Sequence, residues 1–131
     1  MSLRPILLFA VAAACAGLGL IEAAAQSYPN RPIKLIVPFP AGGPPDTIAR
    51  LVGSDISARL GQTVVIDNRA GGGATIGTRA VANAEADGYT LLSASTTSLS
   101  IGPALFKNLD YDPIKSFAPV ASVSLGALVV A

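Results

Sequence analysis

Hydrophobic residues follow two different spacings along the chain from residue 33 onward. Short apolar runs at residues 33–38, 63–67 and 89–94 are too short for helices and predict strands. Between them, apolar residues recur every three or four positions over residues 46–60 and 75–84, which is the spacing of an amphipathic helix. Strands and helices therefore alternate. This order predicts an α/β fold with a mainly parallel sheet and helices on both faces.

Residues at the ends of these segments refine the prediction. Asp46 stands where a helix N-cap is expected, and Gly61 stands where a left-handed residue ends a helix. Farther along, we expect a short helix over residues 99–106, and Asp-Pro turn chemistry at Asp110 and Asp112. The apolar residues 118–131 predict a last, buried strand.

The first 25 residues have the pattern of a secretory signal peptide. Arg4 supplies the positive n-region, residues 6–21 form an apolar h-region, and Ala23, Ala24 and Ala25 supply the small residues that signal peptidase requires. We expect cleavage before Gln26, with domain 26–131 released into the periplasm. An uncleaved transmembrane anchor and a lipid-modified Cys15 are the alternatives.

The composition excludes several kinds of chemistry. The chain has no histidine, and its one cysteine, Cys15, lies in the predicted signal, so zinc sites, a Ser-His-Asp triad and disulfides are excluded from the mature chain. A net charge of +1 gives no basic footprint for nucleic acid. We therefore expect a protein that is not an enzyme, needs no cofactor or metal and binds no nucleic acid.

Three loops rich in glycine or hydroxyl side chains follow the predicted strands, at residues 38–46, 68–75 and 93–98. In a parallel sheet these loops emerge at one edge, where ligands bind. In the first, "PFPAGGPPD", Ala41, Gly42 and Gly43 can turn their backbone N–H groups toward an anion just before a helix. The alternative is that the two glycines only allow a sharp turn.

The second loop does not match a nucleotide site. Gly71, Gly73 and Gly77 have the spacing G-x-G-x-x-x-G, one residue longer than the dinucleotide fingerprint, and no lysine completes a phosphate-binding loop. Arg69 is either a partner for an anion or a solvated charge at a strand end. The hydroxyl groups of residues 93–98 lack a histidine or a nearby lysine to activate them for catalysis.

Several motifs in collinear order resemble one family. "YPNRPIKLIVPFPAGGPPDTIAR", "LGQTVVIDNRAGGGATIGTRAVANAEADGYTLL" and "YDPIKSFAPVA" are similar to the tripartite tricarboxylate transporter receptors, the Bug-type extracytoplasmic solute-binding proteins. The resemblance runs from about Tyr28 to the end of the chain. It implies one incomplete lobe of a type II periplasmic-binding-protein (Venus flytrap) fold, in which residues 26–131 form the N-terminal part and the second lobe is absent.

The resemblance also implies a function. Such a receptor captures a small carboxylate and delivers it to the membrane subunits of a transporter, and we expect it to act as a monomer. A sensory receptor for a carboxylate and a truncated, non-functional fragment are the alternatives. The candidate ligand-binding residues lie in the first and third loops: Phe39, Ala41, Gly42, Gly43, Asp46, Ser95, Thr96 and Thr97.

Overall fold

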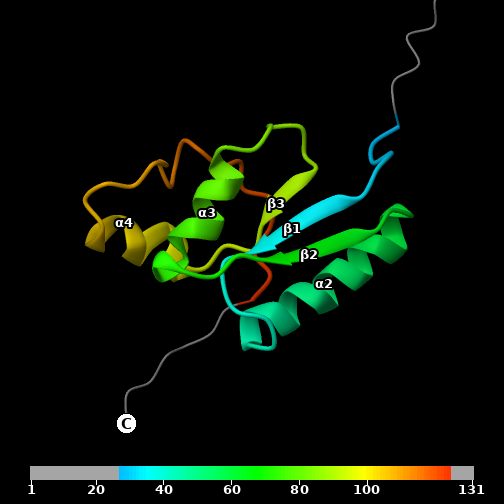
Figure 1. Ribbon diagram of the computed structural model, residues 1–131. Helices are drawn as coiled ribbons and strands as arrows, with labels where there is room; N and C mark the ends of the chain where they lie inside the picture. The colour runs from blue at the N-terminus through cyan, green and yellow to red at the C-terminus, as the bar shows by residue number, and fades with distance from the viewer. Residues whose placement is uncertain (1–26, 125–131) are drawn as a thin grey trace, which may run out of the picture.

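A parallel sheet of three strands forms the centre of the computed structural model, which describes residues 27–124 (Figure 1). The strands are β1 (Ile33–Val37), β2 (Val64–Asn68) and β3 (Thr90–Leu92), in the order β2-β1-β3. Both pairings are parallel, with Leu35 opposite Ile66 on one side and Leu91 on the other. The predicted parallel sheet is therefore confirmed, although β3 is shorter than the apolar run from which it was predicted.

Helices cover both faces of this sheet, as predicted. Helix α2 (Pro44–Leu60) packs against β1 and β2, whereas α3 (Thr75–Ala82) packs against β1 and β3 from the opposite face (Figure 1). Leu35 and Val37 point to the same face of β1 because strand side chains alternate, and they form the core with Ala49 of α2. Strand β1 is thus buried on both faces, which explains its nearly continuous apolar sequence.

Helix α2 begins two residues before the predicted start. Its N-cap is Gly43, and Pro44 and Pro45 occupy the first helical positions. Proline suits these positions because its fixed φ is already helical and its missing N–H has no partner there in any case. The prediction that Asp46 is the N-cap was therefore wrong. Gly61 does end the helix in the left-handed conformation (φ 66°), and its N–H donates to the Ser57 carbonyl at 3.0 Å.

The hydroxyl-rich segment after β3 is partly helical. One π-helical turn covers Thr97–Ile101 and runs directly into α4 (Gly102–Leu105). A short helix was predicted over residues 99–106, and the structure confirms a helix there that begins two residues earlier. Thr97 and Ser98 are consequently helical residues and not loop residues.

The prediction of a buried strand over residues 118–131 was wrong for the part that the structure describes. Residues 118–124 form no strand, and all of them are exposed, including Val120 at 84% and Val123 at 58%. A strand is stabilised by the backbone hydrogen bonds of a neighbour. Residues 118–124 make no such ladder with β3, and the remainder of the prediction lies outside the described residues.

The predicted signal peptide at residues 1–25, together with Cys15, also lies outside the described residues. Within residues 27–124, no helix combines the length and the apolar character that crossing a bilayer requires.

Candidate functional site

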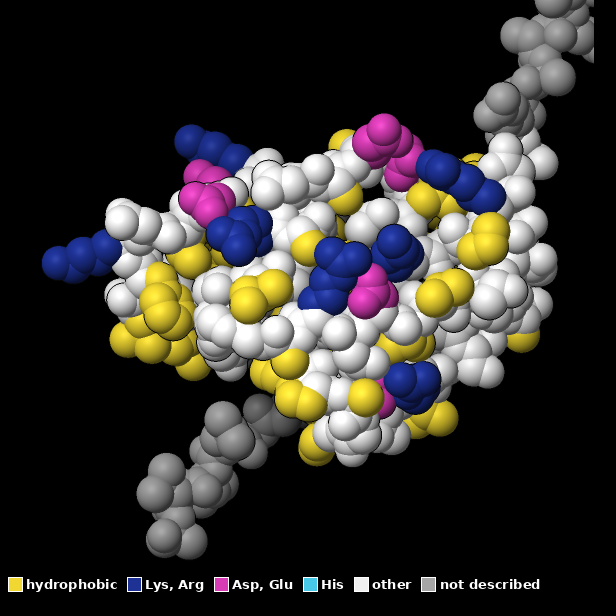
Figure 2. All heavy atoms as spheres, viewed as in Figure 1, with side chains coloured by type: hydrophobic (Ala, Val, Ile, Leu, Met, Phe, Trp, Pro, Cys, Tyr) yellow, Lys and Arg dark blue, Asp and Glu magenta, His cyan; other side chains and the backbone are white. Residues whose placement is uncertain are grey.

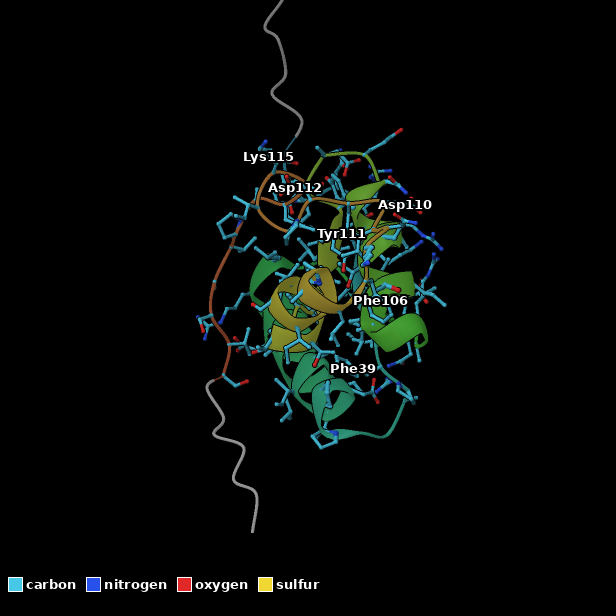
Figure 3. All side chains as sticks on the ribbon, turned by 90° about the vertical axis from the view of Figure 1, so that its left-hand side faces the viewer. Phe39, Phe106, Asp110, Tyr111, Asp112 and Lys115 are labelled. Carbon is cyan, nitrogen blue, oxygen red and sulfur yellow. The ribbon has the colours of Figure 1, made fainter. Side chains whose placement is uncertain are left out.

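The carboxyl edge of the sheet is the place where the predicted ligand loops meet. The chain leaves β1 through α2 on one face to reach β2, and leaves β2 through α3 on the other face to reach β3. The gap between β1 and β3 is therefore the point at which the direction of the crossovers reverses, and open α/β sheets bind their ligands beyond such a point. Figure 3 looks onto this edge, with Phe39 below Phe106.

A buried carboxylate organises the first loop. Asp46 is 3% exposed, and its Oδ2 accepts hydrogen bonds from the Gly42 N–H at 2.8 Å and from Arg50 Nε at 2.9 Å. Its Oδ1 accepts a hydrogen bond from Asn68 Nδ2 at 2.9 Å, and the same amide donates to the Phe39 carbonyl at 3.2 Å. Asp46 therefore ties the loop after β1, helix α2 and the end of β2 to one another.

This network changes the expected anion nest. The N–H of Gly42 is already donated to Asp46, so it is not free for a ligand. The N–H groups of Ala41 and Gly43 have no hydrogen-bond partner among residues 27–124, and Ala41 is exposed. Gly42 has a backbone φ of 84°, a conformation that residues other than glycine rarely adopt. Gly42 thus shapes the loop, whereas its two neighbours keep donors available.

The Asp46 network also predicts how stability depends on pH. The hydrogen bond from Arg50, and then those from Gly42 and Asn68, lower the pKa of Asp46 from 3.8 to about 2. Because the folded pKa lies below the unfolded value, this contribution to stability is present above pH 3.8 and is lost as the pH falls toward 2. We expect the Tm of Asp46→Asn to change less than that of the wild type between pH 5 and pH 2 in thermal unfolding. Parallel Tm curves for the two proteins would contradict this assignment.

The third loop is held by serine and tyrosine hydroxyl groups. The Ser95 N–H donates to Ser98 Oγ at 2.9 Å, and Ser98 Oγ donates back to the Ser95 carbonyl at 2.9 Å. Ser98 is fully buried and its carbonyl accepts a hydrogen bond from the Tyr111 hydroxyl at 2.8 Å. Thr96 is exposed, while Ser95 and Thr97 are half-buried. We call residues 95–98 the hydroxyl turn.

The candidate residues thus fall into two groups at the same edge. Phe39 to Asp46 follow β1, and the hydroxyl turn follows β3, its direct neighbour in the sheet. The Ser93 N–H donates to the Ile36 carbonyl at 2.8 Å, and this hydrogen bond connects the points at which the two loops leave β1 and β3. Both carboxylate oxygens of Asp46 accept hydrogen bonds from other residues of the protein. We therefore assign Asp46 a positioning role and not a direct contact with a ligand.

The second glycine loop is explained by packing. Gly71, Gly72, Gly73 and Ala74 all have positive φ, so the chain turns tightly before α3. A Cβ on Gly77 would lie 2.8 Å from the Arg69 carbonyl oxygen and 2.9 Å from Pro38 Cβ. Arg69 itself forms an ion pair with Asp67 at 3.0 Å. This loop therefore brings α3 close to the end of β1.

The opposite edge of the sheet carries a separate cluster. Arg31 lies 4.2 Å above the ring of Tyr89 and pairs with Asp87, and the Tyr89 hydroxyl donates to Asn30 Oδ1 at 2.9 Å. An open hollow of about 300 Å³ lies beside these residues. Tyr89 packs against Tyr28 and Arg31, and it belongs to the amino edge of the sheet.

The sequence prediction missed four residues that shape the site: Arg50, Asn68, Ser98 and Tyr111. Asn68 is the last residue of β2, and a polar residue at the end of an apolar strand was a signal that could have identified it. Arg50 follows Asp46 at the i,i+4 spacing of a helical ion pair, which was a second signal. Ser98 and Tyr111 are 13 residues apart, and no sequence pattern indicated their contact.

Comparison with known proteins now identifies the family. The profile of the tripartite tricarboxylate transporter family receptor matches residues 48–131. The chain belongs to this receptor family. It is 47% identical over 100 residues to Protein BugT of Bordetella pertussis, an alignment that covers 76% of this chain and 31% of BugT.

Solved structures with similar sequences share the fold. The periplasmic binding protein BugD is 44% identical, with a TM-score of 0.64 over 70% of this chain and 30% of BugD. MatC from Rhodopseudomonas palustris, solved with bound malate, is 39% identical, with a TM-score of 0.66 over 73% of this chain and 33% of MatC. The fold is thus that of a periplasmic binding protein. The chain spans about a third of the length of the curated relatives it matches.

Proposed function

We propose that this chain is part of an extracytoplasmic receptor that captures a small carboxylate and delivers it to the membrane subunits of a tripartite tricarboxylate-type transporter. The observation that carries the proposal is the first loop. Its exposed end offers the N–H groups of Ala41 and Gly43 at the start of α2, where the helix dipole favours an anion. The hydroxyl turn, which follows the neighbouring strand, adds side-chain donors.

The charges at this edge support a ligand bound by neutral donors. Arg50 is paired with Asp46 at 2.9 Å, and Arg69 is paired with Asp67 at 3.0 Å. Both cations are therefore engaged by acids of the protein itself. A ligand carboxylate would accept hydrogen bonds from N–H and hydroxyl groups, whose positions are fixed by the networks around Asp46 and Ser98.

The comparisons support the remaining parts of the proposal. MatC was solved with malate, a small dicarboxylate, and BugD is described as a periplasmic binding protein. By this similarity, we propose a periplasmic location and a role in binding without catalysis. We also propose that the receptor is a monomer when it delivers its ligand. In the longer relatives' fold, a ligand held between two lobes would close them and exclude water.

Thermal unfolding of the purified chain with malate tests the proposal. A ligand that binds only the folded state raises Tm by mass action, and a concentration of about 100 times Kd adds about 2.7 kcal/mol to stability. We expect a concentration-dependent rise in Tm with malate, succinate or citrate, and none with an uncharged amide analogue such as malamide. Equal shifts with acids and amides, or no shift with any of them, would contradict carboxylate capture by this chain.

A further inference from the structure

The segment "LDYDPIKSF", at residues 109–117, has no part in the proposed function so far, yet its central tyrosine reaches the hydroxyl turn. Tyr111 is 8% exposed, and its hydroxyl donates to the carbonyl of Ser98 at 2.8 Å. Burial raises the pKa of Tyr111, so the hydroxyl keeps its proton and remains a donor at neutral pH. The contact joins residues 13 positions apart in the sequence.

Ser98 transmits this contact to the exposed end of the turn. Its Oγ accepts a hydrogen bond from the Ser95 N–H and donates to the Ser95 carbonyl, both at 2.9 Å. The position of Ser98 therefore fixes the backbone of Ser95 and the direction in which Thr96 and Thr97 begin the helical turn. A Cβ on Gly102, one turn later, would lie 2.9 Å from the Thr97 carbonyl oxygen and 3.8 Å from the Tyr111 hydroxyl, so little free space surrounds this contact.

Tyr111 is itself held on both sides (Figure 3). Asp110 accepts a 2.7 Å hydrogen bond from Arg79 of α3. Asp112 accepts hydrogen bonds from the N–H groups of Ile114 and Lys115 at 2.8 and 3.0 Å, which forms a tight turn. The ring of Phe117 packs edge-on against that of Tyr111, with centroids 5.9 Å apart. The two aspartates predicted to be turn formers therefore hold the chain on either side of Tyr111.

We propose that Tyr111 is a positioning residue for ligand binding, which holds the hydroxyl turn in its binding geometry through the Ser98 carbonyl. The proposal rests on the proposed function, because it assigns a role to the turn in carboxylate capture. It also makes a separate claim about the free protein: without the Tyr111 hydroxyl, the Ser95–Ser98 hydrogen bonds open more often.

The test compares two tyrosine-to-phenylalanine variants of the full chain. Tyr111→Phe keeps the ring against Phe117 and removes the hydroxyl group. Tyr89→Phe removes a hydroxyl group that bonds to Asn30 at the opposite edge of the sheet, and serves as the matched control. Malate affinity is measured by calorimetry, exchange of the Ser95 amide by NMR, and Tm by thermal unfolding.

We expect Tyr111→Phe to weaken malate binding about fivefold, the change that corresponds to one neutral hydrogen bond, and to speed exchange of the Ser95 amide by a similar factor. Tyr89→Phe should leave both quantities within twofold of the wild type, even if its Tm falls as much. Equal effects of the two variants on affinity, or an unchanged Ser95 exchange rate in Tyr111→Phe, would overturn the positioning role. If the wild type binds no carboxylate, the proposed function and the binding role both fail, whereas faster Ser95 exchange would still show that Tyr111 holds the turn.

Discussion

Gly77→Ala is expected to lower the free energy of unfolding by about 2 kcal/mol, because a methyl group at this position overlaps atoms that cannot move freely. The new Cβ would lie 2.8 Å from the Arg69 carbonyl oxygen and 2.9 Å from Pro38 Cβ. Both contacts belong to the backbone or to a ring at the ends of β1 and β2, so α3 must shift away from the sheet. For a domain of this size we expect Tm to fall by roughly 10 °C in thermal unfolding.

Gly43→Ala provides the control for this experiment. Gly43 has φ of −81°, and a Cβ there would meet its nearest atoms at 3.7 Å, an ordinary contact distance. We expect this variant to unfold within about 0.5 kcal/mol of the wild type, because the poorer capping by alanine is offset by the smaller backbone entropy that alanine loses on folding at this extended conformation. If the two alanine variants were equally stable, close packing would not be the reason for glycine at position 77.

Asp46→Asn is expected to weaken malate binding about tenfold while the chain remains folded. The substitution removes the negative charge that accepts hydrogen bonds from the Gly42 N–H and from Arg50. The loop after β1 then loses its tie to α2, and binding must order it again at a cost in affinity. Calorimetric titration at neutral pH measures the change.

Asp55→Asn is the matched control on the same helix. Asp55 forms an i,i+4 ion pair with Arg59 at 2.8 Å, as Asp46 does with Arg50. Unlike in that pair, the side chains of both Asp55 and Arg59 are more than 60% exposed. Removing it should leave malate affinity unchanged, because it touches no ligand loop. If Asp55→Asn and Asp46→Asn reduced affinity equally, a general effect of charge on α2 would explain the loss.

One surface of the molecule that sequence patterns did not indicate lies over α4. Leu105 is 70% exposed and Phe106 is 44% exposed, and Figure 2 shows hydrophobic side chains gathered there. The Phe106 ring also lies against Gly73, where a Cβ would come within 3.2 Å of it. The short helix at residues 99–106 could be predicted, but the surface on which its apolar residues lie depends on the packing of the glycine loop.

The sequence by itself determined the order of strands and helices, the parallel sheet and the edge at which the loops emerge. These features depend on the spacing of apolar residues, which is local, and on the rule that parallel strands place their carboxyl ends together. It also located the ends of α2 to within two residues, since glycine and proline act through their own backbone preferences.

Only the tertiary structure decided the roles of individual polar residues. Asp46 looked like an N-cap because it stands before an apolar run, but Asn68, 22 positions away, and Arg50 draw its carboxylate inward. The apolar residues 118–124 looked like a buried strand, although in the described part of the chain they are exposed and pair with no strand. Tyr111 and Ser98 meet because the segment at residues 109–117 folds back onto the hydroxyl turn. Hydrogen bonds between distant segments depend on how elements pack, and a single sequence does not encode that information in any local pattern.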